Sequence, residues 1–331
     1  MKAAIMEINK MGDDDFLYRL LSLLKKQIPY SINGIGRIRA DVYLVKTDQV
    51  WFILKRYSSY QKLKIQETFT HSLYMEGFTN TYRFYLFNEE PLIVDRNLYG
   101  CIEYILPNNQ AFSYANKANR QEALDVLNKY YETTTKLVDS YKYILPKHQM
   151  MEKWLERYSQ FKRNRSIIRY FLDEQLINQL MYWAEWSLEH LERERHFFEN
   201  GNNVILHGDV AHHNFLRGKN DLLYLIDFDL ISIGPTSVDY VQFATRILPL
   251  INWSFYQLEK IDVFQPLLKK KQFLIALVYP TDILREWNRL IRQNKQTDKR
   301  SIQQLLQLTT NQFAKRKKFI QKIIKIVGKM E

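Results

Sequence analysis

The sequence predicts an α+β protein in which strands come first and helices follow. Up to about residue 107, short apolar and aromatic runs alternate with polar turns, as half-buried strands do. From about residue 116 onward, long segments with apolar residues at helical spacing predominate. Segregation of strands and helices along a chain is typical of α+β folds. With 331 residues, the chain is long enough for two parts that each bury a core.

In the N-terminal part, two apolar runs predict strands and one longer segment predicts a helix. The strands are expected over Asp41–Lys46 and Val50–Leu54, with a short polar turn between them. The segment Tyr60–Glu76 has apolar residues along one broad side and is expected to be the helix of this part. Pro107–Asn109 has the composition of a turn and is expected to join this part to the next.

In the C-terminal part, the apolar spacing predicts several helices, interrupted by the strands of one short region. The last of them is amphipathic and basic, and we expect it to pack on its own domain rather than on a membrane. The expected helices cover Asn119–Asp139, Gln149–Phe161, Ser166–Glu199 and segments from Asp239 to the end, with the amphipathic one over Leu305–Val327.

A short loop carries the candidate catalytic residues. The apolar run Val204–Leu206 predicts the end of a strand, and a loop with its tip at Gly208 follows it. His207 and Asp209 lie in this loop. Asp209 is a candidate to orient or deprotonate a substrate hydroxyl, because a carboxylate can accept its hydrogen bond.

An amide and a second acid follow at a spacing that is typical of Mg-nucleotide sites. Asn214 lies five residues after Asp209, and Asp227 follows a second apolar strand, Leu222–Ile226. We expect the two strands to form a hairpin through Asn220–Asp221, which would return Asp227 to the end that carries Asp209. Asn214 and Asp227 are the candidate metal ligands, because Mg²⁺ prefers hard oxygen ligands and few protein contacts.

The same pattern has a plainer interpretation. Asp and Asn side chains also satisfy backbone groups in polar turns, and His-x-Asp-x4-Asn alone arises by chance in roughly a few per cent of chains of this length. The later Asp227, between an apolar strand and Phe228, favours the phosphoryl-transfer interpretation. His212 and His213 are expected to be loop residues near phosphate or substrate, because one cysteine and no spaced histidine partner argue against zinc.

The segment from His207 to Asp229 resembles the catalytic loop of the aminoglycoside phosphotransferase and choline kinase superfamily. The helix that Asp239 opens resembles the continuation of that superfamily. More narrowly, the whole chain is similar to CotS-type proteins of bacterial endospore coats. This similarity rests on the chain length and on four segments: Trp51–Arg56, His71–Phe78, Leu145–Pro146 and Asp239–Arg246.

The resemblance implies a bilobal, protein-kinase-like fold. A small β-rich N-terminal lobe would cover residues 1–107 and bind nucleotide, and a larger helical lobe over residues 108–331 would carry the catalytic and substrate groups. The implied cofactors are ATP or GTP and Mg²⁺, and the implied partner is a small molecule with a hydroxyl acceptor. Other spore coat proteins are further implied partners, and the spore coat is the implied location.

The superfamily also implies a strand lysine that contacts the nucleotide phosphates and pairs with a helix acid. Lys55, directly after the apolar run that ends at Leu54, fits this role. Glu67 is the candidate partner, with Glu76 as the second choice. Lys55 has an alternative interpretation as the start of a solvated basic turn with Arg56, because the chain contains 48 lysines and arginines.

Two further nucleotide contacts are expected in the N-terminal lobe. By resemblance, the hinge between the lobes falls at residues 101–105, where the backbone of Glu103 and Ile105 would pair with the adenine edge. Gly34 and Gly36 form a Gly-x-Gly that is weak evidence for a phosphate-covering loop, and they can equally shape a bend before the first strand. Arg37 or Arg39 is a candidate to hold phosphate in place of backbone donors.

Composition and charge limit the class of protein and the compartment in which we expect it. Hydrophobic residues make up 46% of the chain, so we expect a globular protein. A single cysteine suits a reducing compartment, and no run of about 18 apolar residues predicts a membrane span. Residues 1–15 lack the apolar core of a secretion signal, so the protein is expected to be cytoplasmic when synthesised. The net charge of +12 has no accompanying nucleic-acid motif, and its clusters are expected to be solvated helix faces.

The residues and the resemblance together leave two functions of different classes, and the second of them is implied by the resemblance alone. The first is an ATP- and Mg²⁺-dependent phosphotransferase acting on a small-molecule hydroxyl. The second is a catalytically inactive assembly protein of the spore coat that retains the kinase-like fold, because fold alone does not determine function. The basic C-terminal half disfavours a cationic antibiotic as acceptor and favours an anionic or neutral sugar-like or polyol molecule.

Overall fold

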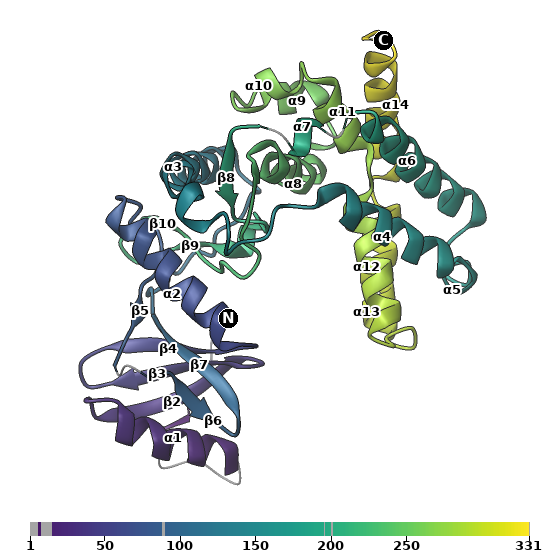
Figure 1. Cartoon of the computed structure of the whole chain (residues 1–331). Coiled ribbons are helices and arrows are strands. Elements are labelled where there is room, and N and C mark those ends of the chain that lie inside the picture. The colour runs from purple at the N-terminus through teal and green to yellow at the C-terminus, as the bar shows by residue number, and fades with distance from the viewer. Residues whose placement is uncertain (1–5, 8–14, 88–89, 195, 200, 331) are drawn as a thin grey trace. The chain divides into compact units, whose positions relative to one another are not determined.

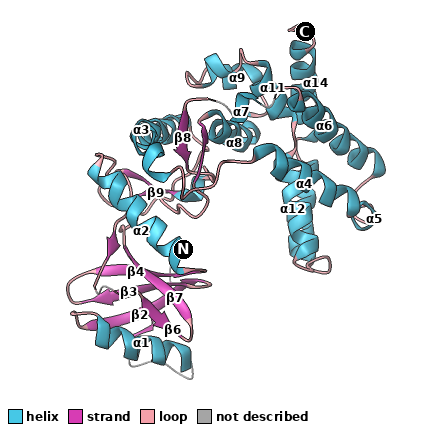
Figure 2. Ribbon diagram, in the orientation of Figure 1, coloured by secondary structure: helices cyan, strands magenta, loops and turns pink. Residues whose placement is uncertain are grey.

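The computed structural model describes residues 6–7, 15–87, 90–194, 196–199 and 201–330, so most of the segment 1–15 lies outside the described residues. The chain forms two compact units (Figure 1). Unit 1 comprises Met1–Phe112, Asp125–Thr133 and His213–Asp229, and unit 2 comprises Ser113–Leu124, Thr134–His212 and Leu230–Glu331. Strands dominate the N-terminal region and helices the C-terminal part, which confirms the α+β prediction (Figure 2). The lobe boundary at residue 107 stays a prediction.

Unit 1 is built on an antiparallel sheet whose path runs β1-β2-β3-β4-β7-β5, with β6 pairing beside β7. Two helices, α1 (Asp15–Gln27) and α2 (Tyr60–Met75), accompany the sheet. The strands are β1 (Met6–Glu7), β2 (Ile32–Arg39), β3 (Val42–Thr47), β4 (Trp51–Tyr57), β5 (Phe84–Tyr85), β6 (Leu92–Val94) and β7 (Asn97–Glu103).

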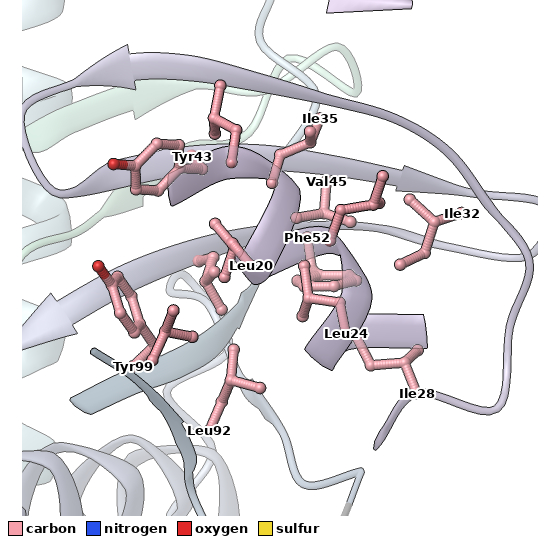
Figure 3. Close-up of a cluster of buried hydrophobic side chains, with 14 residues drawn as sticks. Leu20, Leu24, Ile28, Ile32, Ile35, Tyr43, Val45, Phe52, Leu92 and Tyr99 are labelled. Carbon is pink, nitrogen blue, oxygen red and sulfur yellow. The ribbon is translucent and has the colours of Figure 1, made fainter. Parts of the chain in front are cut away.

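Helix α1 covers one face of this sheet and closes a hydrophobic core. Leu20 and Leu24 project from α1 toward inward-facing residues of the strands, among them Val45 and Phe52 (Figure 3). All four side chains are buried, so their removal from water stabilises the unit. The sequence predicted only one helix in this region, and that prediction is wrong. Helix α1 gains its stability from packing on the sheet.

The glycine pair lies inside a strand instead of in a loop or before the first strand. Gly34 pairs with Lys46 and Gly36 with Leu44, both in the β2–β3 ladder. The ladder has a register shift just before Gly34, and glycine is common at such bulges. The turn falls later, where Asp41 adopts a left-handed φ of 62°.

Helix α2 confirms the prediction for Tyr60–Glu76 to within one residue. Its N-terminus is capped by Ser59, whose hydroxyl accepts a hydrogen bond from the backbone N–H of Lys62 at 3.2 Å. The chain leaves the helix through Gly77, whose φ of 88° is favourable for glycine.

The predicted hairpin of Val204–Leu206 with Leu222–Ile226 is wrong. In unit 1, β10 (Leu223–Leu225) pairs with β9 (Phe215–Arg217), a strand that the sequence did not predict. In unit 2, β8 (Asn203–Leu206) pairs with β11 (Ser232–Pro235). The apolar runs indicated two strands correctly, but an apolar run does not specify its partner, and the argument that joined Asp227 to Asp209 through a shared hairpin fails.

Unit 2 is mainly helical. The predicted helices Asn119–Asp139 and Gln149–Phe161 are confirmed to within two residues at each end, and part of the first belongs to unit 1. The helices in chain order are α3 (Lys117–Tyr141), α4 (Met150–Arg163), α5 (Arg165–Ile168), α6 (Glu174–Glu192), α7 (His196–Glu199), α8 (Ser237–Ile247), α9 (Phe255–Glu259), α10 (Phe264–Leu267), α11 (Lys271–Val278), α12 (Thr281–Arg292), α13 (Lys299–Thr310) and α14 (Phe313–Val327), with short 3₁₀ turns η2 (His212–Asn214) and η3 (Leu248–Ile251).

Two predicted helices are broken in the structure. The segment predicted as one helix over Ser166–Glu199 forms α5, α6 and α7, and Asp173 caps the start of α6 by accepting from the N–H of Gln175. The amphipathic C-terminal segment divides into α13 and α14, because Gln312 adopts a left-handed φ of 65°. Among the described residues, no helix combines the length and apolar character needed to cross a membrane.

A buried ion pair attaches α14 to α12. The Arg316 guanidinium donates to both carboxylate oxygens of Asp282, at 2.7 and 3.1 Å, and lies over the ring of Trp253. The Arg316 side chain is only 7% exposed. Burial raises the pKa of the Asp282 carboxyl, but the charge and hydrogen bonds of Arg316 outweigh it and hold the pKa below its ordinary value.

Replacing Arg316 with Leu is expected to lower the free energy of unfolding by about 3 kcal/mol, because Asp282 loses its cation in a partly buried position. Urea unfolding followed by circular dichroism measures the change. The exposed neighbour Lys317→Leu provides the control and should change stability by less than about 0.5 kcal/mol. Equal stabilities of the two variants would contradict the prediction.

Candidate functional site

Lys55 lies in the middle of the sheet of unit 1 and pairs with two aspartates. It belongs to β4, opposite Val42 of β3 and Gly100 of β7. Its Nζ donates to Asp227 and to Asp229, each at 2.8 Å, and its side chain is 12% exposed. The interpretation as a solvated basic turn is therefore wrong, because Lys55 is a sheet residue held in an ion-pair network.

Asp227 is held as a carboxylate by two cations. Burial by itself raises the pKa of Asp227, but Lys55 and then Arg39 outweigh it and hold the pKa below its ordinary value. The Arg39 guanidinium, from the end of β2, lies 3.5 Å from Oδ2 of Asp227. Asp227 also adopts a left-handed φ of 73°, which is uncommon for a residue with a Cβ and is found often at functional sites.

Phe228 anchors the short Asp-Phe-Asp segment. Its ring is almost completely buried and packs against Phe69 of α2, Tyr82, and Tyr130 of α3, with ring centroids 5.5 to 6.0 Å apart. An aromatic residue fixed on several sides leaves little freedom to the carboxylates on either side of it. The aspartates are therefore positioned by the core of unit 1.

Helix α2 contacts this network through Gln66, and Glu67 has a different partner. The Gln66 amide donates to Asp229 at 2.6 Å, and its oxygen accepts from the Tyr57 hydroxyl at 3.1 Å. Glu67, the predicted partner of Lys55, instead forms an ion pair with Lys64 at 2.8 Å. In the described part of the chain, the ion pairs of Lys55 go only to the two aspartates, so a Lys55–Glu67 contact stays a prediction.

Asn214 and Asp227 lie at the same open end of the β9–β10 hairpin. Phe215 pairs with Leu225, and the backbone N–H of Ile226 donates to the Asn214 carbonyl at 2.9 Å. The register therefore places Asn214 opposite Ile226 and one residue from Asp227. The Asn214 side chain is buried. The two predicted metal ligands are brought together in this way by β9 and β10.

The predicted hinge, residues 101–105, begins within β7 and includes the last three residues of that strand. Glu103 is the last residue of β7, and its N–H donates to the Arg83 carbonyl at 2.8 Å while its carboxylate accepts from the Arg83 N–H at 3.2 Å. Ile105 follows two residues later and is partly buried. Their assignment to the adenine edge stays a prediction.

In unit 2, the loop after β8 is held by a buried acid from helix α8. Gly208 adopts a φ of 79°, and the carboxylate of Asp239 accepts from the backbone N–H groups of His207 and Gly208 at 2.9 and 3.2 Å. Gln242, one turn further along α8, donates to the Gly208 carbonyl at 3.1 Å. The loop conformation thus depends on α8 as well as on β8.

Asp209 and His207 have different surroundings in this loop. The Asp209 carboxylate is 30% exposed and accepts from the guanidinium of Arg246 at 2.5 Å. His207 is fully buried, and its ring Nδ1 accepts from the Asp209 N–H at 3.4 Å. The Asp209 carboxylate is therefore the group of this loop that a substrate can reach. The buried His207 ring contacts the backbone of Asp209 and so helps to position it.

Several members of these networks were not predicted as site residues. They are Gln66, Asp229, Asp239, Gln242 and Arg246. Asp229 and Asp239 stand out in the sequence as acids beside apolar segments, and a search for paired acids would have included them. Arg246 and the two glutamines have no local signal, because their roles depend on which helix face meets the loops.

Comparisons with known proteins identify the family of this chain and solved structures of similar fold. The model of the phosphotransferase enzyme family matches residues 34–257, more than half of the chain, and the protein belongs to that family. A search of curated proteins finds no significant match. The fold is similar to that of an aminoglycoside phosphotransferase from Alicyclobacillus acidocaldarius, with a TM-score of 0.68, 17% identity, and coverage of 92% of this chain and 95% of the other.

Two further solved structures share the fold. Aminoglycoside 2'-phosphotransferase-IIIa, in complex with GDP, has a TM-score of 0.60 at 15% identity and covers 91% of this chain and 99% of its own. Spectinomycin phosphotransferase, in complex with ADP and spectinomycin, has a TM-score of 0.60 at 14% identity, with coverage of 94% and 97%. These similarities confirm the kinase-like fold predicted from the resemblance.

The lowered pKa of Asp227 predicts an acid-dependent loss of stability. In the unfolded chain an aspartate titrates near pH 4, so the ion pairs of Asp227 contribute fully above that pH and are lost as the pH falls toward the lowered folded pKa. Urea unfolding at a series of pH values should show wild type losing stability more steeply below about pH 4 than Asp227→Asn. Parallel curves for the two proteins would contradict this prediction.

Proposed function

We propose that the protein transfers the terminal phosphoryl group of ATP or GTP, with Mg²⁺, to a hydroxyl of a small molecule. The observation that carries this proposal is the Lys55–Asp227 ion pair on the central strand of unit 1, in a member of the phosphotransferase enzyme family. Nucleotides in the solved relatives, GDP in one and ADP in another, support a nucleotide as donor.

The residues of unit 1 fit a nucleotide-bound Mg²⁺. Asn214 and Asp227 offer hard oxygen ligands at one end of a hairpin. Among the described residues no cluster of three or more His, Cys, Asp or Glu side chains could hold a metal. Two protein ligands suit Mg²⁺, which keeps several waters and shares phosphate oxygens. When bound, the ion would neutralise charge on the phosphates, and Lys55 would pair with phosphate oxygens.

In the same proposal, Asp209 accepts the hydrogen bond of the acceptor hydroxyl. Its carboxylate is partly exposed on a loop whose backbone is fixed by Asp239. A base fixed in this way contributes through orientation and proton acceptance. His207 would act through the loop conformation, since its buried ring accepts from the backbone of Asp209.

Calorimetric titration of Mg-ATP at fixed ionic strength tests the proposal. We expect Mg²⁺-dependent binding to wild type and at least about tenfold weaker binding to Asp227→Ala, because a metal ligand and the partner of Lys55 are lost. Asp262→Ala, which removes an exposed carboxylate from unit 2, is the control and should bind as wild type. Wild type that binds no nucleotide at millimolar ATP or GTP would refute the proposal.

A structural role in the spore coat is the second candidate. The resemblance to CotS-type proteins supports that location, and several tyrosines are unusually exposed for such large side chains, including Tyr143 at 90% and Tyr170 at 78%. Exposed tyrosines suit contacts with other proteins. Spores that carry only Asp227→Ala would separate the two functions. Normal coat composition with this variant would favour the structural role, and a defective coat would favour phosphotransfer.

A further inference from the structure

Lys55 and Tyr57 lie on the same face of β4. The alternate residues of this strand, Phe52 and Leu54, belong to the core that α1 closes. Because side chains alternate between the two faces of a strand, Lys55 and Tyr57 point to the face away from α1. The Nζ atom of Lys55 lies 5.5 Å from the centroid of the Tyr57 ring. The strand therefore presents an amine and a phenol side by side.

A closed set of contacts runs from Tyr57 through helix α2 and back to Lys55. The Tyr57 hydroxyl donates to the side-chain oxygen of Gln66 at 3.1 Å, and the Gln66 amide donates to Oδ1 of Asp229 at 2.6 Å. Lys55 donates to the same Oδ1 atom at 2.8 Å. A carboxylate accepts hydrogen bonds but cannot donate them, so only one orientation of the Gln66 amide satisfies both of its neighbours. The set begins and ends on β4 and fixes both ends of the amide.

Close packing of α2 on the sheet holds Gln66 in this place. The Gln66 side chain is 4% exposed and that of Tyr57 is 5% exposed. Leu63, three residues earlier on the same face of α2, lies beside Gly100 of β7, where a Cβ would be 2.7 Å from the Leu63 side chain. Gly100 pairs with Lys55 in the β4–β7 ladder. The missing side chain at Gly100 thus lets α2 pack directly beside Lys55.

The two acids that pair with Lys55 differ in their other partners. Asp227 also meets Arg39, whereas Asp229 is bound to α2 through Gln66. If Asp227 binds Mg²⁺, as proposed, its carboxylate is shared with the ion, and Asp229 is the acid that stays available to Lys55. An ammonium group has three N–H donors, so Lys55 can keep its contact with Asp229 while it donates to a phosphate.

Resting on the proposed function, we infer that Asp229 and Gln66 are positioning residues for Lys55. Asp229 holds the ammonium group where it meets the nucleotide phosphates, and Gln66 holds Asp229 against α2. The position of α2 is thereby transmitted to Lys55 through an amide and a second acid. A glutamate in place of Gln66 would not serve, because its carboxylate would face that of Asp229 with no proton to donate.

Acylation of the full chain by N-hydroxysuccinimidyl acetate, followed by mass spectrometry, tests this inference without any phosphoryl acceptor. The exposed Lys62 of α2 is the internal reference. In nucleotide-free wild type, Lys55 should react about tenfold or more slowly than Lys62, because two carboxylates engage its amine. Gln66→Leu and Asp229→Ala should each raise the Lys55 rate about threefold or more. Asp229 is 48% exposed, so water can replace its lost contacts and the second variant keeps its fold.

Saturating Mg-ATP provides the main comparison. Nucleotide should slow the acylation of Lys55 by about tenfold or more in wild type, and by about threefold or less in Gln66→Leu and Asp229→Ala, because Lys55 is then no longer held at the phosphates. Calorimetry gives the concentration that saturates each protein, so the comparison measures the position of Lys55 and not nucleotide affinity. Gln61→Leu makes the same change at an exposed position of α2 and should behave as wild type.

The double variant and the Mg²⁺ requirement separate the possible outcomes. Gln66→Leu combined with Asp229→Ala should match Asp229→Ala within about twofold, because Gln66 acts through Asp229. Equal protection of Lys55 in wild type and Gln66→Leu would overturn the inference and leave the phosphotransferase proposal intact. A Mg²⁺ requirement that changes in Asp229→Ala but not in Gln66→Leu would make Asp229 a metal ligand and would also overturn it. Wild type that binds no Mg-ATP refutes the proposed function and the inference together.

Discussion

Replacing Asp209 with Asn is expected to lower kcat by about three orders of magnitude while Mg-ATP binding stays within about twofold of wild type. The amide keeps the size of the side chain but cannot take the hydroxyl proton. Asp209 belongs to unit 2, whereas Lys55, Asn214 and Asp227 belong to unit 1, so the substitution leaves the nucleotide ligands in place.

Steady-state release of nucleoside diphosphate, with the most active acceptor, measures kcat, and calorimetry measures nucleotide binding on the same preparations. Asp262→Asn makes the same chemical change at an exposed position of unit 2 and should be fully active. Full activity of Asp209→Asn would remove this residue from the mechanism. A large loss of nucleotide binding in the variant would instead indicate that its effect is structural.

The second large effect is expected from Gly208→Ala, on stability and on activity together. Gly208 has a left-handed φ of 79°, and a Cβ at this position would lie 2.2 Å from the carbonyl oxygen of Leu230. Left-handed backbone costs roughly 1–2 kcal/mol for a residue with a Cβ. The contact with a backbone atom adds to this, so we expect a loss of about 3 kcal/mol or more. The loop that carries Asp209 would have to move.

Gly77 provides an unusually close control for this substitution. Its φ of 88° is also left-handed, but a Cβ there would meet no atom within 4 Å. Gly77→Ala should therefore show the backbone strain alone, about 1 kcal/mol, and leave turnover unchanged. The difference in urea unfolding between the two variants isolates the clash with Leu230. If the two variants lost equal amounts of free energy of unfolding, the contact between the new Cβ and the Leu230 carbonyl would be relieved without cost.

Short-range patterns in the sequence predicted where helices and strands form better than they predicted which strands pair with each other. The helix Tyr60–Glu76 and the strands around Val50–Leu54 and Val204–Leu206 were predicted because apolar spacing acts within a few residues, although β4 continues to Tyr57. The pairing of β8 with β11, and of β9 with β10, was not found. Strand partners are chosen by packing between distant segments, and a three-residue strand such as β9 has too little sequence to show periodicity.

The candidate site also combines residues that the sequence indicated with contacts that it did not. Asp209, Asn214 and Asp227 were predicted from residue type and spacing, because phosphoryl transfer needs those groups whatever surrounds them, and Lys55 was predicted from the resemblance to the superfamily. Glu67 was predicted from its position on a helix, and the contact that the structure shows from that helix to the network runs from its neighbour Gln66 to Asp229. A rotation of one residue about a helix axis changes the face by about 100°, and spacing alone does not set that rotation.

Local periodicity and the chemistry of single residues were sufficient to predict the α+β class, most of the elements and a set of candidate site residues. Only the tertiary structure decided which charges meet: Lys55 with Asp227 and Asp229, and Asp209 with Arg246. Each pair joins residues far apart in the chain, and such contacts depend on how the sheet and helices pack.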